Sequence, residues 1–301
     1  MKGHLLCVPC TVRAAYDIAV KATDNEELRK AVLIETLKWL SKNDVAIKMT
    51  PAMLHTYVFR FVQKITGNKD PFAHLKRESN KVVMNLMHLL RSNIEKQSFE
   101  ESFKIAALGA ICGNSIDFEV EGYQVSLEDL GRSLSECLKG DLMLDDTPKL
   151  MDALSKSKTV LYLLDNAGEI VFDKIFMQVM IEKYSVKVLA AVKSGPVLND
   201  ATMDDALQVG LNEVADVITT GSDSIGLNLS ECSEEFLRYL NNSDIIIAKG
   251  QGYYESITEV EHIIQKPIAY MLKAKCSVVA KSLNVRQGSN VIKLVNYPPK
   301  K

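Results

Sequence analysis

The chain has 301 residues, enough for about two domains of ordinary size and at least one complete hydrophobic core. Hydrophobic residues make up 47% and charged residues 25%, which excludes a disordered or fibrous chain. The 36 basic and 38 acidic residues give a net charge of −2, so no overall positive field would draw the chain to nucleic acid or an anionic membrane. No apolar run suits a membrane helix or a signal peptide, so we expect a cytoplasmic protein.

The six cysteines are too few for a dense disulfide framework in a chain of this length, and we expect reduced thiols. Only Cys7 and Cys10 are closely spaced. Such a pair could bind a metal or act in redox chemistry, but a single pair without a second one is equally compatible with structural thiols. The five histidines show no spacing typical of metal ligands.

The first half of the chain reads as helices. Asp24 and Glu27 can form a capping box, and Thr50 and Asp70 each precede a proline, an arrangement favoured in the first turn of a helix. A further apolar stripe at helical spacing is expected to end near Gly113, since a glycine suits a C-terminal turn.

Short apolar runs alternate with amphipathic segments from about residue 155 onward. The predicted strands are residues 159–164, 187–192, 216–220, 244–248, 268–272 and 291–295. The predicted helices between them include residues 171–183, 201–207, 234–240 and 275–283. This pattern predicts an α/β fold with a mainly parallel, doubly wound sheet. We therefore expect a mainly helical domain over residues 1–150 and an α/β domain over residues 151–301.

Ligands of such sheets bind beyond the carboxyl ends of the strands. Carboxylates, amides, lysines and glycines gather in the segments that follow the predicted strands, at residues 165–169, 195–200, 221–224, 249–252 and 273–275. These residue types can hold a hard cation and a phosphate group.

Asp165, Asn166 and Asp200 could offer three oxygen ligands from neighbouring strand ends, leaving other octahedral positions to water and substrate. Oxygen ligands favour magnesium, manganese or a related divalent ion over zinc. The alternative is that Asp165 and Asp200 only cap the helices that follow them.

Common nucleotide motifs are absent from the sequence. It has no Gly-Lys-Ser/Thr phosphate loop, and no glycine triplet with dinucleotide spacing follows the first predicted strand. Ala167 stands two positions after Asp165, where phosphatases with an aspartyl nucleophile have a second aspartate.

Seven motifs occur in order through most of the chain. They are Cys7-Val8-Pro9-Cys10, Asp70-Pro71-Phe72 with Lys76, Gly113-Asn114 with Ile116-Asp117-Phe118, Asp165-Asn166-Ala167-Gly168-Glu169, Pro196-Val197-Leu198-Asn199-Asp200-Ala201-Thr202, Lys249-Gly250-Gln251-Gly252 with Glu255, and Lys273-Ala274-Lys275-Cys276. Together they resemble the metal-dependent damage-control phosphatases. The paired cysteines and compact size are similar to the stand-alone branch of archaea and some other microbes.

The resemblance implies a Rossmann-like three-layer α/β/α domain with a helical N-terminal domain. It also implies hydrolysis of small phosphorylated metabolites, such as sugar phosphates or nucleotides, with manganese, nickel, cobalt or magnesium as cofactor. Asp165, Asn166 and Asp200 match the family's metal ligands, and Lys249 matches a lysine at the phosphate. Tyr253 and Tyr254 depart from the asparagine and aromatic residue expected after Gly252, which bears on the substrate pocket.

The expected reaction is attack of a metal-activated water on the phosphoryl group, with Glu169 or Asp200 orienting the water. Asn114 and Asp117 would close over the substrate, unless they only cap helix ends. The complete expected substrate-binding set is Asn114, Asp117, Asn199, Gly250, Lys273 and Lys275.

Two other functions compete with this one. Carboxyl methyltransfer is also claimed for members of the family, although Ala167-Gly168 offers only one glycine for a methyl-donor loop. A metabolite-binding or redox-sensing protein would instead rely on Cys7 and Cys10 and would bind its ligand without turnover.

Overall fold

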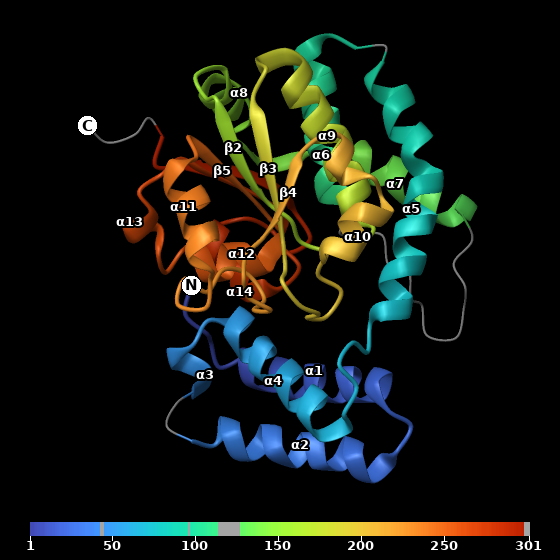
Figure 1. Cartoon of the computed structure of the whole chain (residues 1–301), viewed down its shortest axis with the longest axis vertical. Coiled ribbons are helices and arrows are strands. Elements are labelled where there is room, and N and C mark those ends of the chain that lie inside the picture. The colour runs from blue at the N-terminus through green and yellow to red at the C-terminus, as the bar shows by residue number, and fades with distance from the viewer. Residues whose placement is uncertain (43–44, 96, 114–126, 298–301) are drawn as a thin grey trace.

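The computed structural model describes residues 1–42, 45–95, 97–113 and 127–297. A sheet of seven strands forms its centre, in the order β1-β7-β6-β5-β2-β3-β4 (Figure 1). The strands are β1 (Leu142–Asp145), β2 (Thr159–Leu163), β3 (Lys187–Val192), β4 (Asp216–Thr219), β5 (Ile245–Lys249), β6 (Ile268–Lys273) and β7 (Asn290–Val295). All neighbouring pairs are parallel except β6 and β7. The predicted α/β class with a mainly parallel sheet is confirmed.

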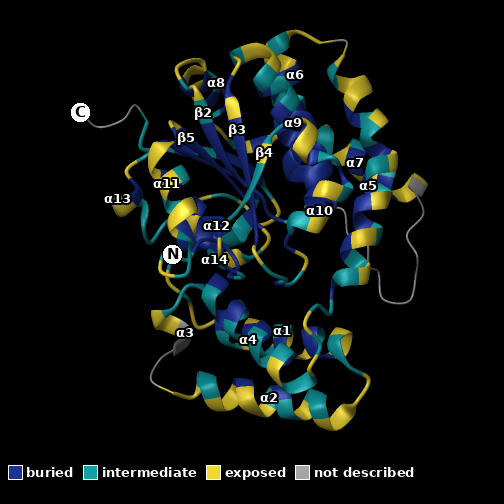
Figure 2. Cartoon of the chain, in the orientation of Figure 1, coloured by how far each residue is buried: buried dark blue, intermediate teal, exposed yellow. Residues whose placement is uncertain are grey.

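Helices cover both faces of the sheet. The helices are α1 (Cys7–Ala22), α2 (Glu26–Leu40), α3 (Val45–Lys48), α4 (Pro51–Thr66), α5 (Ala73–Ile94), α6 (Phe99–Cys112), α7 (Leu127–Leu138), α8 (Thr147–Ser155), α9 (Glu169–Tyr184), α10 (Met203–Gln208), α11 (Glu234–Asn242), α12 (Gly250–Ile257), α13 (Glu261–Ile264) and α14 (Ser277–Leu283). Alternate residues of β2 enter opposite cores: Val160 and Tyr162 pack with α6 and α9, whereas Leu161 and Leu163 pack with α11, α12 and α14. The sheet is thus the middle one of three layers, and its central strands are buried while the edge strand β4 is only partly buried (Figure 2).

Helices α1 to α4 form a separate bundle, here called the helical lobe, against one end of the sheet (Figure 1). Its core contains Ile18 and Phe59, and it also takes in Val197 and Ile225 from the segments after β3 and β4. The lobe therefore packs on the edge where ligands of such sheets bind. Helices α5 to α7 and strand β1 precede residue 150 but lie with the sheet, while the division into domains at that residue stays a prediction.

Most predicted strands match the structure closely, but β1 was not predicted. It has only four residues at the sheet edge and alternates in burial, so it lacks the continuous apolar run of a central strand. The glycine-rich segment after β5 has the composition of a loop, yet α12 begins at Gly250 without an intervening turn.

The predicted starts and ends of the helices are confirmed only in part. Thr50 caps α4 by accepting a hydrogen bond from the Met53 amide, as expected, whereas the cap of α2 is Asn25 rather than Asp24. Helix α6 ends before Gly113, and a Cβ there would lie 3.0 Å from the Cα of Glu169. Close packing of α6 on α9, and not a left-handed turn, is thus the reason for this glycine.

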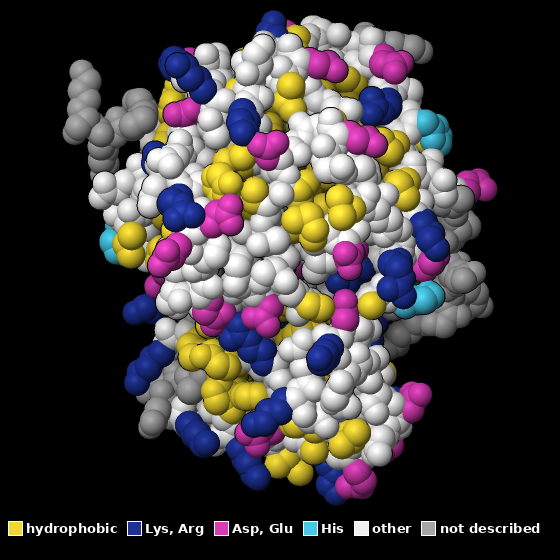
Figure 3. Space-filling model, in the orientation of Figure 1, with side chains coloured by type: hydrophobic (Ala, Val, Ile, Leu, Met, Phe, Trp, Pro, Cys, Tyr) yellow, Lys and Arg dark blue, Asp and Glu magenta, His cyan; other side chains and the backbone are white. Residues whose placement is uncertain are grey.

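The expectation of reduced thiols is wrong for one pair, because Cys112 and Cys137 form a disulfide between α6 and α7. Cys7, Cys10, Cys232 and Cys276 are free thiols in the structure. None of the helices described has both the length and the apolarity needed to cross a membrane. Acidic and basic side chains are interspersed over the face seen in Figure 3, in line with the near-zero net charge.

A buried carboxylate joins the helical lobe to the sheet. Glu255 of α12 is 6% exposed and accepts hydrogen bonds from the Gln251 side chain and from the Ala52 amide in the first turn of α4. Burial raises the pKa of Glu255 from 4.5 to about 7, against the lowering effect of these bonds and of the N-terminal amine. The ionised form is therefore costly in the folded protein near neutral pH.

The raised pKa of Glu255 predicts how the stability of the fold depends on pH. A raised pKa in the folded state contributes stability that is present below about pH 4.5 and lost as the pH rises through about 7. We expect Glu255→Gln to unfold like the wild type at pH 4.5 and to be more stable by roughly 1–3 kcal/mol at pH 8, measured by urea denaturation. Glu182→Gln, at an exposed position of α9, is the control. Parallel stability curves for wild type and Glu255→Gln across this range would contradict the prediction.

Candidate active site

The segments after β2 and β3 meet at the edge of the sheet that faces the helical lobe. Asn166 and Asp200 form an isolated antiparallel bridge, the Ala167 amide donates to the Asn199 carbonyl at 2.9 Å, and the Ala201 amide donates to the Asp165 carbonyl at 2.7 Å. These backbone bonds fix Asp165, Asn166 and Asp200 next to one another. The structure thus brings together the three predicted metal ligands.

Asn166 connects the acidic side chains of this edge. Its amide nitrogen donates to Asp165 Oδ2 at 2.9 Å and to Glu169 Oε2 at 3.2 Å. Asp165 and Glu169 are buried, as is Asp200. Burial, followed by the charges of Glu169 and Asp200, raises the pKa of Asp165 well above its usual range. Several carboxylates therefore share a site with little water to stabilise their charge.

Gly250 provides space for Asp165. It has a φ of +77°, and a Cβ at this position would lie 1.8 Å from Asp165 Oδ2. Glycine is required here both by its left-handed conformation and by the close approach of the carboxylate. The sequence predicts Gly250 as substrate-binding; the structure places it against a predicted metal ligand.

Lys193 is a site residue that the sequence reasoning missed. It follows β3 directly and is fully buried, with Nζ 3.7 Å from Asp200 Oδ2. The ammonium group donates to the Gly226 carbonyl at 2.6 Å and to the Tyr253 hydroxyl at 3.0 Å, and it lies 4.1 Å from the centre of the Tyr253 ring. Lys193 directly follows the predicted strand at residues 187–192, and this position could have identified it as a site residue. The candidate residues predicted after that strand start only at Gly195.

Lys193 and Asp200 influence each other's charge. Burial raises the pKa of Asp200 to about 6, and Lys193 opposes that rise. Burial likewise lowers the pKa of Lys193, against the effect of the Asp200 and Asp165 charges. Among the described atoms, Asp200 Oδ2 has no hydrogen-bond partner. The Lys193 ammonium, 3.7 Å away, is its ion-pair partner, and the oxygen still has capacity to accept a shorter contact.

Lys249 lies beneath the carboxylates and is fully buried. Its ammonium group donates to Glu169 Oε1 at 2.5 Å, to Asp173 Oδ1 at 2.7 Å and to the Ala110 carbonyl at 2.8 Å. Burial lowers the pKa of Lys249, but the Asp173 and Glu169 charges outweigh it and the net change is upward. Three protein acceptors thus account for the three N–H groups of Lys249. One of them is Glu169, whose carboxylate Lys249 holds in place. The predicted contact of Lys249 with a phosphate group stays a prediction.

Asp173 was also missed by the sequence reasoning. It lies four residues after Glu169 on the same face of α9, a spacing that could have identified it. The Tyr162 hydroxyl donates to its Oδ1 at 2.6 Å, and burial raises its pKa to about 7.

A cavity of about 510 Å³ opens beside these groups, between α5, α10 and the ends of β3 and β4. Three basic residues, Lys76, Arg77 and Lys193, and three acidic ones, Asp70, Asp204 and Asp205, line it. Lys76 is buried and pairs with Asp70 at 3.0 Å and with Asp205 at 3.6 Å. The cavity is therefore lined by charges of both signs, and Lys193 connects it to Asp200.

Helix α5 is attached directly to the segment that carries the predicted ligands. The Gly168 amide donates to Asn80 Oδ1 at 2.6 Å, and the Asn80 amide nitrogen donates to Asp205 Oδ1 at 3.0 Å. Neither Asn80 nor Asp205 was singled out from the sequence. Asn80 has no motif to mark it, whereas Asp205 forms a capping box with Thr202 that could have been recognised.

The structure shows fewer interactions with the carboxylates for the other predicted substrate-binding residues. Asn199 contributes its carbonyl to the backbone of the site, and the charge of Lys275 lowers the pKa of Asp165. Lys273 is partly buried, which lowers its pKa, as does the charge of Lys275. Asn114 and Asp117 lie outside the described residues.

The paired cysteines lie at the start of α1. Cys7 is buried, and Cys10 Sγ is 3.9 Å from His55 Nε2. Burial raises the pKa of both thiols, which disfavours the reactive thiolate form. Within the described ranges, no group of three or more His, Cys, Asp or Glu side chains could hold a metal. Asp165, Glu169 and Asp200 therefore do not form such a group, and the predicted metal set combines two carboxylates with the amide Asn166.

Comparison with known proteins gives full-length matches. An uncharacterized protein of Methanocaldococcus jannaschii is 40% identical over 95% of this chain and 93% of its own. A protein of Pyrococcus horikoshii named as a damage-control phosphatase is 35% identical over 97% of each chain. A similarly named protein of Archaeoglobus fulgidus is 34% identical over 98% of this chain and 100% of its own.

The fold agrees with a solved structure. A crystal structure of a DUF89 family protein from Pyrococcus horikoshii superposes with a TM-score of 0.87 at 34% identity, covering 97% of this chain and 98% of that one. The family model of the damage-control phosphatase ARMT1-like domain matches residues 4–291. With a family match over nearly its whole length and relatives this similar, the chain belongs to the damage-control phosphatase ARMT1-like domain family.

Proposed function

We propose that this protein is a phosphatase that hydrolyses small phosphorylated metabolites with a divalent cation held by Asp165, Asn166 and Asp200. The observation that carries the proposal is the packing of buried carboxylates at one strand edge, where Asp200 Oδ2 accepts no hydrogen bond from the described residues and has only the Lys193 ammonium among them, 3.7 Å away, as an ion-pair partner. The names of the relatives from Pyrococcus horikoshii and Archaeoglobus fulgidus support the phosphatase activity.

The donor set fits a hard cation. Two carboxylates and one amide are oxygen donors of the kind that magnesium and manganese prefer, and they leave positions for water and substrate. Buried acids with raised pKa values gain from a positive charge placed between them. When bound, such an ion supplies charge neutralisation at the phosphoryl oxygens and lowers the pKa of water.

The protein's own residues would position the reacting groups. Hydrogen bonds from the Asn166 amide nitrogen to Asp165 and Glu169 fix the orientation of that amide. Lys249 holds Glu169, so one of its carboxylate oxygens stays at the site to orient a water molecule. Asp200 is the other candidate for this role. An oriented water and an immobile phosphoryl group are what in-line displacement requires.

The cavity beside the site would take a small phosphorylated substrate. Arg77 and Lys193 would attract the phosphate ester, whereas Asp70, Asp204 and Asp205 would suit hydroxyl groups of its organic part. Sugar phosphates and nucleotides are both small enough for a cavity of about 510 Å³.

The proposal predicts metal-restored turnover. We expect metal-stripped protein to hydrolyse p-nitrophenyl phosphate once manganese, cobalt, nickel or magnesium is added, and Asp165→Asn to lose at least about 100-fold in kcat/KM. Asp216→Asn is the control, since Asp216 pairs with Lys187 where β3 and β4 begin, at the opposite edge of the sheet. Equal turnover by wild type and Asp165→Asn would contradict the proposed site.

Further substrates separate the competing functions. Sugar phosphates and nucleotides are assayed by phosphate release, and a labelled methyl donor is assayed for carboxyl transfer. Methyl transfer without phosphate release would favour the methyltransferase, whereas ligand binding without any turnover would favour a binding protein.

Gly250 gives a second prediction. Gly250→Ala should weaken manganese binding at least about 10-fold, because its Cβ would displace Asp165. Gly67→Ala is a matched control: Gly67 also has a positive φ, of 75°, but a Cβ added there would have nothing within 4 Å. Both variants should lose about 1–2 kcal/mol of unfolding free energy from backbone strain. Isothermal titration would show normal manganese affinity only for Gly67→Ala, and normal affinity in both variants would contradict the prediction.

A further inference from the structure

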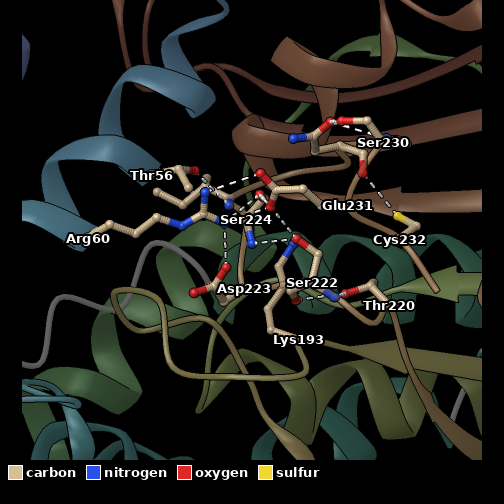
Figure 4. A network of polar contacts seen from close by, with 12 residues as sticks. Thr56, Arg60, Lys193, Thr220, Ser222, Asp223, Ser224, Ser230, Glu231 and Cys232 are labelled. Carbon is tan, nitrogen blue, oxygen red and sulfur yellow. Dashed lines mark hydrogen bonds and ion pairs between the residues drawn. The ribbon is translucent and has the colours of Figure 1, made fainter. Parts of the chain in front are cut away.

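The segment after β4 connects the helical lobe to Lys193. This segment, residues 221–232, passes between α4 and the buried lysine, as Figure 4 shows. Arg60 and Thr56 approach it from α4, one helical turn apart, and Lys193 lies on its other side. A contact made by the lobe can therefore reach the site through a few residues.

Arg60 binds the segment with its whole guanidinium group. Its Nη1 and Nη2 donate to the two carboxylate oxygens of Glu231 at 3.1 and 2.6 Å, and Nη2 also donates to Asp223 Oδ1 at 2.5 Å. A paired arginine fork fixes orientation as well as distance. This contact is thus more specific than a single surface ion pair.

The carboxylate of Glu231 then organises the turn around it. Oε2 accepts hydrogen bonds from the hydroxyls of Ser222 at 3.0 Å and Ser224 at 2.6 Å. The hydrogen bond from Arg60 is the largest influence on Glu231 and, with these hydroxyls, lowers its pKa to about 2. Thr56 Oγ1 accepts a bond from the Ile225 amide at 3.0 Å, so α4 holds this turn at two points.

The next residue of the turn holds Lys193. Gly226 has a φ of +68°, and its carbonyl accepts the bond from Lys193 Nζ at 2.6 Å. On the opposite side it packs on α12, where a Cβ would lie 2.3 Å from the Gly252 carbonyl. The Ser194 amide, directly after Lys193, donates to the Ser222 carbonyl at 3.0 Å. This turn, together with the Tyr253 hydroxyl of α12, therefore sets where the ammonium group lies beside Asp200.

We propose that Arg60 is a positioning residue for the active site: by holding residues 222–226 through Glu231 and Asp223, it sets the Gly226 carbonyl and thereby the Lys193 ammonium beside Asp200. Docking of the helical lobe and the geometry of the site are then coupled. The expected effect on kcat rests on the proposed phosphatase function. The expected displacement of the Lys193 ammonium does not.

The kinetic test compares Arg60→Met with the wild type. We expect kcat for p-nitrophenyl phosphate to fall by about 10-fold to 100-fold with KM little changed, since small displacements at a reacting centre are costly. Arg60→Lys, which keeps the charge but not the fork, should have an intermediate kcat. Arg29→Met is the matched control, because Arg29 pairs with Asp24 and Glu26 inside the helical lobe, and it should keep wild-type kcat.

A spectroscopic test does not require turnover. Lys193 and Lys249 are both fully buried, so their ammonium ¹H–¹⁵N signals are expected to be protected from solvent exchange at mildly acidic pH. The Lys193 signal, assigned by its loss in Lys193→Arg, should shift or broaden in Arg60→Met. The Lys249 signal should stay in place, because Lys249 bonds to α6 and α9 and not to residues 222–226.

The two readouts give distinct outcomes. An unchanged Lys193 signal in folded Arg60→Met overturns the proposal, and so does a wild-type kcat in that variant. If the wild type hydrolyses no phosphate ester, the proposed function fails, and the Lys193 signal alone decides whether Arg60 positions the lysine.

Discussion

Buried charge at one edge of the sheet is the constraint on which the site depends. Four carboxylates, of Asp165, Glu169, Asp173 and Asp200, share this region with the ammonium groups of Lys193 and Lys249. Burying an unpaired charge is expensive, so the ammonium group of each lysine donates hydrogen bonds to acceptors in the protein. The backbone at Gly250 likewise lies close against Asp165. In the proposed function, a divalent cation at the outer carboxylates would stabilise the ionised form of these acids.

The two lysines divide the acids into an outer and an inner group. Lys193 lies beside Asp200, where the cavity opens, whereas Lys249 binds Glu169 and Asp173 beneath the edge. Glu169 belongs to both groups because its second oxygen accepts from Asn166. The inner group thus serves as a rigid support for the outer one, a division of roles common around metal sites in proteins.

The sequence allowed the fold to be predicted more completely than the site. Strands β2 to β6 are short, mostly apolar parallel runs, so the residues that follow them lie at one edge, which was enough to place Asp165, Asn166 and Asp200 together. The partners of these residues could not be predicted in the same way. Lys193 and Asp173 contact the site through side chains that reach across elements, and Arg60 meets Glu231 from a position 171 residues away. The Arg60 contact depends on how the lobe packs on the sheet, which no local periodicity encodes. Lys193 and Asp173 had sequence signals, directly after β3 and four residues after Glu169, but their partners become visible only in the folded sheet domain.

The order of elements along the chain has a consequence for folding. The helical lobe occupies the first 66 residues and has a core with Ile18 and Phe59, but its partners on the sheet edge come more than 130 residues later. During synthesis the lobe is complete before the strands it will cover exist, and long-range contacts of this kind form late. We therefore expect the lobe to collapse early and to dock last, so the site reaches its final geometry only when the whole chain has been made.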